Sequence, residues 1–126
     1  MGYRSQVVLA FDKAILPKFL DVIARSENTK RLVFEWRESW DKDFEIPSFH
    51  WADKEDDHSK GHHCIIWDHI KWYPDEDTKA IENFVHDNYE NARFIRIGEE
   101  YDDSEDFGEF AQDSIQIERT QSIEFF

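Results

Sequence analysis

The first forty residues change their hydrophobic period twice. In 3–11 (YRSQVVLAF) Tyr3, Val7, Leu9 and Phe11 fall on one alternating face and Arg4 and Gln6 on the other, which predicts a strand. Asp12 then offers a helix N-cap, and 13–26 carries apolar residues at the three- and four-residue spacing of an amphipathic helix. Alternation returns in 31–40 (RLVFEWRESW), so these residues are expected to form a second strand.

The rest of the chain also switches between the hydrophobic periods of strands and helices. Residues 41–61 are polar and show no sustained period, and such a long connection within a small domain is typical of a functional segment. A third strand is predicted over 62–73, and a second helix follows over 75–89 after a proline. The periods of 92–98 and 114–125 predict two more strands.

The order of these elements predicts an α+β fold. Strand, helix, strand, strand, helix and strand form the ferredoxin-like or split βαβ arrangement, to which a C-terminal hairpin is added. Right-handed crossovers place both helices on one face of an antiparallel-rich sheet. The residues expected to be buried are Val7, Leu9, Phe11, Phe19, Ile23, Phe34, Ile81, Phe84 and Ile95.

Composition indicates a protein that folds as one domain over residues 1–126. Hydrophobic residues make up 40% of the chain and aromatic residues 16%, whereas disordered acidic chains contain few aromatics. Cys64 is the only cysteine, so no intrachain disulfide can form, and a reducing compartment, the cytoplasm, is expected. Beside apolar neighbours, Cys64 is expected to be a packed, unreactive thiol. No apolar run approaches the length of a membrane span.

The net charge of −14 restricts the kinds of partner. The charge is uneven, because residues 1–37 hold seven basic and four acidic residues, whereas 38–126 hold eight basic and twenty-five acidic ones. An excess of this sign opposes direct binding of nucleic acid and favours encounter with basic proteins. The five tryptophans could form a base-stacking platform, but such platforms accompany a positive groove, so packing in the core and at interfaces is preferred.

The most acidic stretch, 98–113 (GEEYDDSEDFGEFAQD), has eight acids among sixteen residues and no Lys or Arg. A calcium loop starting at Asp102 fails, because Phe107 occupies the position at which the loop needs glycine. A solvated connection between strands is the simplest interpretation. Aromatic residues among the acids favour the alternative that this stretch is an interface for a basic partner.

Candidate catalytic and metal-binding residues have weaker patterns. His58, His62 and His63 are the candidate zinc ligands, but neighbouring strand residues point to opposite faces and no CxxC or HExxH element is present. Asp75 and Asp77 lie where a helix begins, and capping of that helix explains them better than a nuclease site does. A polar loop and a non-enzymatic protein, with no metal and no cofactor, are therefore expected.

Three blocks of the sequence resemble small proteins of unknown function encoded by bacteriophages and prophages. They are MGYRSQVVLAF at the start, IKWYPD at 70–75 and FIRIGEEYDD at 94–103, and together they cover about a fifth of the chain. The resemblance implies an accessory protein that acts inside a bacterial cell. It implies no catalytic residues.

The leading hypothesis is an acidic binding protein that inhibits a host or anti-phage defence protein by imitating DNA. Its partner is expected to be a basic, nucleic-acid-binding host protein. A metal-dependent enzyme that uses the His58–His63 region and a self-assembling structural or regulatory protein are the alternatives. The predicted binding surface consists of Glu99, Glu100, Tyr101, Asp102, Asp103, Glu105, Asp106, Phe107, Glu109 and Phe110, supported by Asp53, Glu55, Asp56 and Asp57.

Overall fold

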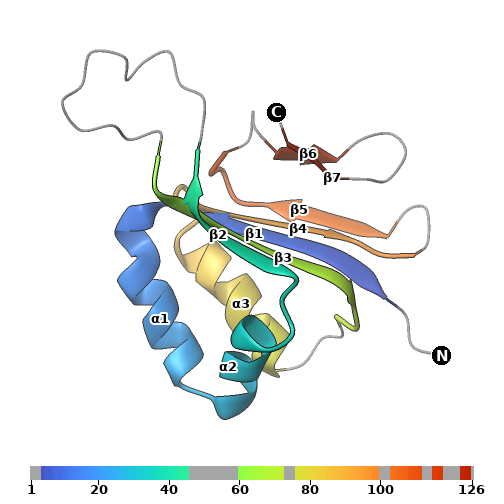
Figure 1. The fold of residues 1–126 in the computed structure, drawn as a ribbon, viewed down its shortest axis with the longest axis horizontal. Coiled ribbons are helices and arrows are strands. Elements are labelled where there is room, and N and C mark those ends of the chain that lie inside the picture. Colours follow the sequence, from blue (N-terminus) through green and yellow to red (C-terminus); the bar gives the residue numbers. More distant parts are fainter. Residues whose placement is uncertain are drawn as a thin grey trace.

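A five-stranded antiparallel sheet forms the centre of the molecule, with three α-helices on one face and a small two-stranded sheet over the other (Figure 1). The α+β class predicted from the sequence is thereby confirmed. The structure is a computed structural model, and it describes residues 4–45, 60–72, 76–99, 103–111, 115–117 and 123–125. No helix in these ranges is both long and apolar enough to span a membrane.

The elements are both strands and helices up to Asp87, and the last four are strands. In chain order they are β1 (Ser5–Phe11), a 3₁₀ turn η1 (Lys13–Ile15), α1 (Leu16–Ala24), α2 (Glu27–Phe34), β2 (Ser39–Phe44), β3 (His62–Ile70), α3 (Glu76–Asp87), β4 (Ala92–Ile97), β5 (Ser104–Phe107), β6 (Ile115–Ile117) and β7 (Ile123–Phe125). The predicted helices over 13–26 and 75–89 correspond to η1 with α1 and to α3.

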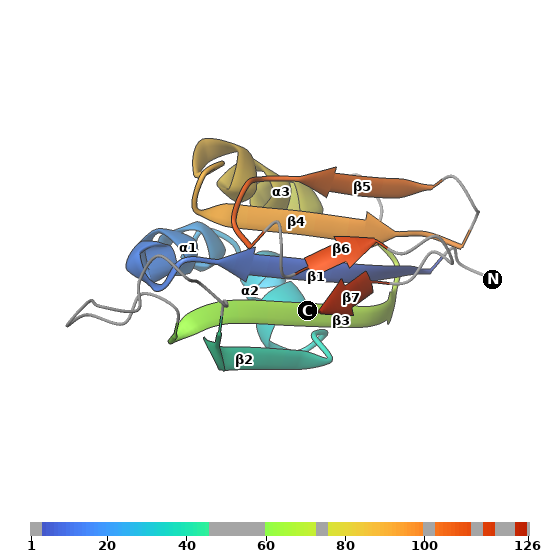
Figure 2. The same cartoon turned by 90° about the horizontal axis from the view of Figure 1, so that it is seen from above.

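The central sheet has the strand order β2-β3-β1-β4-β5, and each neighbouring pair is antiparallel. β1 therefore lies in the middle, paired with β3 on one side and β4 on the other. β6 pairs with β7 in a separate hairpin above the sheet (Figure 2). The two edges of the central sheet are formed by β2 and β5, so residues far apart in the sequence define the two sides of the molecule.

The main core lies between the sheet and the helices. Alternate residues of β1 point to this side, where Phe11 meets Phe19 of α1 at a centroid distance of 4.8 Å and Phe84 of α3 at 5.5 Å. The indole N–H of Trp67 donates to the carbonyl of Leu32, 2.8 Å away, which fixes the end of α2 to the sheet. Eight of the nine residues predicted to be buried are buried: Val7, Leu9, Phe11, Phe19, Ile23, Ile81, Phe84 and Ile95.

A second, smaller core covers the opposite face of the sheet. It gathers the other alternating residues of β1, Val8 and Ala10, with Cys64 of β3 and Ile95 of β4. Phe110 and Ile123, from the segments that follow β5, pack over them. The C-terminal part of the chain therefore shields a face that the helices leave uncovered.

The prediction of a strand over 31–40 is wrong. Residues up to Phe34 belong to α2, whose N-cap Ser26 accepts a hydrogen bond from the N–H of Thr29. Thr29 and Val33, one helical turn apart, face the core, and Phe34 at the end of the helix is 50% exposed rather than buried. Alternation over a few apolar residues did not separate a strand from a short helix, because a short helix satisfies it as well.

Two further boundaries differ from the predictions. The polar segment 41–61 begins inside β2, which spans Ser39–Phe44, and residues 46–59 of it lie outside the described residues. The final strand of the central sheet is β5, within the acidic stretch, rather than 114–125. Residues 115–117 and 123–125 form instead the β6–β7 hairpin, so a C-terminal hairpin is present as predicted.

Candidate binding surface

The acidic stretch is built onto the sheet by arginines of β4. Arg93 is buried and donates from Nε and Nη2 to the two carboxylate oxygens of Asp106, each at 2.9 Å. Its Nη1 donates to the carbonyl of Ala111 at 3.1 Å. Parallel hydrogen bonds of this kind fix both the position and the plane of a carboxylate. Asp106 is thus held on the face of the sheet that the helices do not cover.

Arg96 forms a second cluster on the helix side of the same strand pair. Its guanidinium donates to Asp103 at 2.6 and 3.1 Å, to Glu105 at 2.9 Å and to the hydroxyl of Ser5 at 3.2 Å. The hydrogen bonds to Asp103 are the main cause that raises the pKa of Arg96 above its ordinary value. Burial, followed by the closeness of Glu105, raises the pKa of Glu82 on α3.

Asp103, Glu105, Asp106 and Glu109 form what we term the carboxylate edge, which runs along β5 and just beyond it. The Asp106 and Glu105 side chains are 36% and 42% exposed, and that of Asp103 is 32% exposed, so each keeps an outward surface despite its arginine. Glu109 is exposed. The carboxylate edge therefore combines fixed carboxylates with access to solvent.

Phe107 and Phe110, the aromatic residues of this stretch that the structure describes, serve the fold. Phe107 stacks between Phe94 at 4.9 Å and the ring of His86 at 4.3 Å, and it is only partly exposed. Phe110 is buried against His62, so the expectation that it anchors a partner needs correction. Gly108 between them has a φ of +95°, and a Cβ there would lie 2.1 Å from the carbonyl oxygen of Ala92. The backbone at Gly108 crosses β4 so closely that a side chain at this position would not fit.

The remaining residues of the predicted binding surface divide into two groups. Glu99 is exposed, and its carboxylate accepts a hydrogen bond from the backbone N–H of Arg4 at 2.7 Å. The others lie outside the described residues, and they are Glu100, Tyr101, Asp102, Asp53, Glu55, Asp56 and Asp57. The structure thus unites the residues of the carboxylate edge and places Glu99 in the connection between β4 and β5.

The candidate metal ligands are separated by the sheet. His62 packs against Phe110 on one face, and its Nδ1 accepts from the N–H of Lys13 at 3.1 Å. His63 stacks on Phe11 on the other face, and its Nδ1 accepts from the indole N–H of Trp40 at 3.1 Å. His58 lies outside the described residues. Within the part of the chain that the structure describes, no three His, Cys, Asp or Glu residues are grouped to hold a metal ion.

Protonation of His63 is expected to destabilise the fold. Burial, assisted by Lys42, lowers the pKa of His63 below its ordinary 6.5. Between that lowered pKa and 6.5 the unfolded chain binds a proton that the folded chain does not, so stability falls as the pH falls through this window. Urea unfolding between about pH 7 and pH 5 should show a shallower loss of stability for His63→Gln than for the wild type. Equal slopes would refute this role for His63.

Cys64 is a packed thiol, as predicted from the sequence. It is 3% exposed, and burial raises its pKa to about 12, so the reactive thiolate is scarce at neutral pH. A thiol reagent should therefore modify the native protein far more slowly than the urea-unfolded protein, in which Cys64 is accessible. Rapid modification of the native protein at neutral pH would contradict this prediction.

Asp77 lies in the first turn of α3 and joins this helix to α2. Its carboxylate accepts from the hydroxyl of Thr29 at 2.9 Å and from that of Ser26 at 3.2 Å. Contacts of this kind explain an acid at a helix N-terminus without a nuclease site. Asp75 lies outside the described residues.

Sequence reasoning missed Arg93 and Arg96, the two residues that organise the carboxylate edge. A signal for them was present, because ARFIRI places two arginines among apolar residues of a predicted strand, and the structure buries all six positions. A charged side chain in a buried strand requires a partner of opposite charge. The stretch with the most acids, 98–113, directly follows this strand.

Comparison of the chain with models of protein families, with curated proteins and with solved structures finds no match.

Proposed function

We propose that the protein is a non-enzymatic binding protein whose carboxylate edge engages a basic, nucleic-acid-binding protein. One observation carries this proposal: two buried arginines fix three half-exposed carboxylates along an edge strand. A solvated loop that only connects two strands does not need carboxylates that are fixed by buried arginines. Side chains already held in place lose less conformational entropy when a partner binds, which favours affinity.

The balance of charge around β4 and β5 supports a basic partner. Asp106 pairs with Arg93, Asp103 and Glu105 pair with Arg96, and the exposed Glu99 and Glu109 lie beyond the two ends of β5, so these five carboxyl groups exceed the two guanidinium groups by three. A negative field of this kind steers basic surfaces toward the molecule and repels nucleic acid. The carboxylate edge therefore suits a protein partner that itself carries a cationic groove.

Imitation of DNA is the form of binding that we propose for this edge. One strand of duplex DNA presents a charge about every 3.4 Å along the axis. Asp103, directly before β5, and Glu105 within it are two residues apart, roughly 6.8 Å in an extended chain, which is about half of that density. Glu99 and Glu109, beyond the two ends of β5, extend the row. A phage-encoded inhibitor of a host or defence protein in the bacterial cytoplasm is the biological role that fits this chemistry.

We also propose that the fold is a variant of the ferredoxin-like arrangement. The order β2-β3-β1-β4, with helices between β1 and β2 and between β3 and β4, supports it. The variant adds α2 to the first connection and β5 to the sheet edge. This addition creates the strand that bears the carboxylate edge.

A capture experiment from bacterial lysate tests the proposed function. The immobilised protein should retain basic DNA-binding proteins at low salt and release them as salt rises, because charge attraction of exposed groups is screened. Glu99→Gln combined with Glu109→Gln should slow association, since both acids are exposed. The fold should survive these changes.

The matched control carries the same change of charge on the helix side of the molecule. Asp21→Asn with Glu27→Gln alters two exposed acids of α1 and α2 that form only local pairs with Arg25 and Lys30. This variant should bind like the wild type. Retention that does not change with salt, or that falls equally in both double variants, would overturn the proposal.

A further inference from the structure

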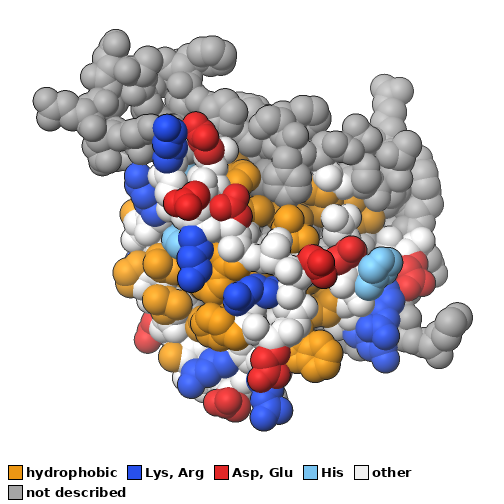
Figure 3. Space-filling view, viewed as in Figure 1, with side chains coloured by type: hydrophobic (Ala, Val, Ile, Leu, Met, Phe, Trp, Pro, Cys, Tyr) orange, Lys and Arg blue, Asp and Glu red, His pale blue; other side chains and the backbone are white. Residues whose placement is uncertain are grey.

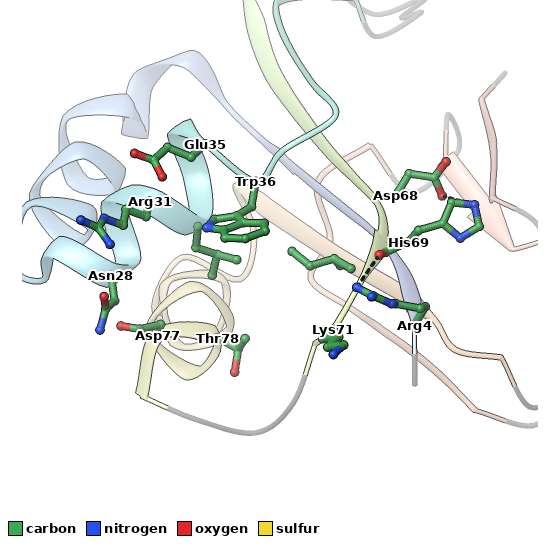
Figure 4. A pocket seen from close by; sticks show the side chains of 12 residues that line it. Arg4, Asn28, Arg31, Glu35, Trp36, Asp68, His69, Lys71, Asp77 and Thr78 are labelled. Atoms are coloured by element: carbon green, nitrogen blue, oxygen red, sulfur yellow. Dashed lines mark hydrogen bonds and ion pairs between the residues drawn. The ribbon is translucent and has the colours of Figure 1, made fainter. Parts of the chain in front are cut away.

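A cavity of about 530 Å³ lies between α2, the first turn of α3 and the end of β3 (Figure 4). Its volume is within the range of small-molecule sites, about 300–1,000 Å³. Leu32 and Ile70 give it apolar walls, and Arg4, Arg31 and Lys71 bring three cationic side chains to it. Apolar walls with a few polar groups are typical of a ligand site.

In the part of the chain that the structure describes, the cationic side chains of this cavity form no ion pair. Among the described residues, neither Arg31 nor Lys71 forms an ion pair, although acids outnumber basic residues by 29 to 15 in the whole chain. Arg4 donates to the carbonyl of His69 at 3.3 Å, a neutral group. Three acids line the cavity. Asp77 accepts hydrogen bonds from Ser26 and Thr29, and the other two acids are Glu35 and Asp68. An anionic group is the ligand chemistry that these cations favour.

Trp36 supplies a planar apolar surface to the same cavity. Its side chain is 65% exposed, the most exposed of the large hydrophobic residues that the structure describes. Figure 4 shows Trp36 on the side of α2, with Arg4 and Lys71 on the side of β3. An exposed indole facing a cavity is suited to stacking on an aromatic ring.

The backbone of the cavity wall is also unusual. His69 has a φ of 52°, in the left-handed region that non-glycine residues seldom adopt. Such conformations concentrate at ligand sites, where surrounding contacts maintain them. Here the hydrogen bond from Arg4 holds the His69 carbonyl, so one cation of the cavity also maintains the conformation of its wall.

We propose that this cavity binds a nucleoside monophosphate, with the base on Trp36 and the phosphate near Arg4 and Lys71. A ring and an anionic group are both required, because the cavity offers the Trp36 indole on the side of α2 and the cations Arg4 and Lys71 on the side of β3. A single nucleotide is favoured over a nucleic-acid chain, since a protein of net charge −14 repels a polyanion along most of its length. This site lies apart from β5 and goes beyond the proposed function.

Calorimetric titration of the full chain with adenosine and guanosine monophosphates tests the proposal. At least one should bind with a Kd below about 1 mM. Trp36→Ala and Lys71→Gln should each weaken that binding by roughly tenfold or more, because each removes one of the two required contacts. Both residues are exposed, so the variants should unfold like the wild type in urea.

Matched controls use an exposed aromatic and an exposed lysine away from the cavity. Tyr89→Ala and Lys18→Gln should leave the Kd unchanged. Adenosine alone and inorganic phosphate alone should each bind more weakly than the monophosphate. Any of three results would overturn the proposal: neither monophosphate binds, Trp36→Ala and Lys71→Gln bind like the controls, or adenosine, phosphate or a single-stranded oligonucleotide binds at least as tightly as the monophosphate.

Discussion

Replacing Phe110 by Ala is expected to lower the free energy of unfolding by about 3 kcal/mol. The ring is 7% exposed and packs edge-on to His62 at a centroid distance of 5.1 Å, in the small core that covers the outer face of the sheet. Truncation would leave a cavity next to the close crossing of Gly108 over β4, where the backbone has little room to collapse. Urea unfolding followed by circular dichroism measures the change.

The control for this variant is Phe34→Ala, at a ring that is 50% exposed. The ring centroids of Phe34 and Trp40 are 5.8 Å apart, and the Arg37 guanidinium lies over the Phe34 ring. Loss of these surface contacts should lower the free energy of unfolding by less than about 1 kcal/mol. Figure 3 shows that basic and acidic side chains lie among hydrophobic ones on the face of the molecule seen in Figure 1. If Phe34→Ala were the more damaging change, the assignment of Phe110 to the core would be wrong.

Replacing Arg96 by Met is expected to lower the free energy of unfolding by about 2–3 kcal/mol. Removing one partner of a buried ion pair typically costs about 3–5 kcal/mol, because the other charge is left without compensation. The Arg96 side chain is 10% exposed, but Asp103 and Glu105 are 32% and 42% exposed and regain part of their hydration, which reduces the loss. The same urea titration measures it.

A surface arginine provides the comparison. Arg25 pairs with Asp21 at 3.0 Å, and both side chains are 71% exposed, so Arg25→Met should change stability by less than about 0.5 kcal/mol. Adding Glu105→Gln to Arg96→Met should recover part of the lost stability, because it removes one of the carboxylates left unpaired. An Arg96→Met variant as stable as Arg25→Met would show that the carboxylate edge is not anchored as the structure indicates.

The parts of the fold that sequence patterns predicted are those with one dominant period. α3 buries one face against the main core, so its apolar residues recur at the spacing of a helix, and alternate residues of β1 enter the same core while the others enter the smaller one. α2 was not predicted from the sequence because it is eight residues long and its only buried residues are Thr29 and Val33. β5 was not predicted because its sequence, SEDF, is typical of a solvated loop. Only its pairing with the arginines of β4 explains why it forms a strand.

The candidate binding surface was located by its acid content, whereas its construction depends on tertiary contacts. Composition alone does not reveal that Asp106 lies on one face of the sheet with Arg93 while Glu105 lies on the other with Arg96. It also does not separate Phe110, which is buried, from Glu109, which is exposed. These differences follow from strand register, which changes the face of every side chain when it shifts by one residue.

Competition between the captured partner and duplex DNA tests the central claim most directly. The affinity of the partner for this protein would be measured at fixed salt with increasing concentrations of duplex DNA. If the carboxylate edge occupies the cationic groove of the partner, DNA should raise the apparent Kd in proportion to its concentration, as a competitor does. A Kd that stays constant while the partner is saturated with DNA would contradict the account.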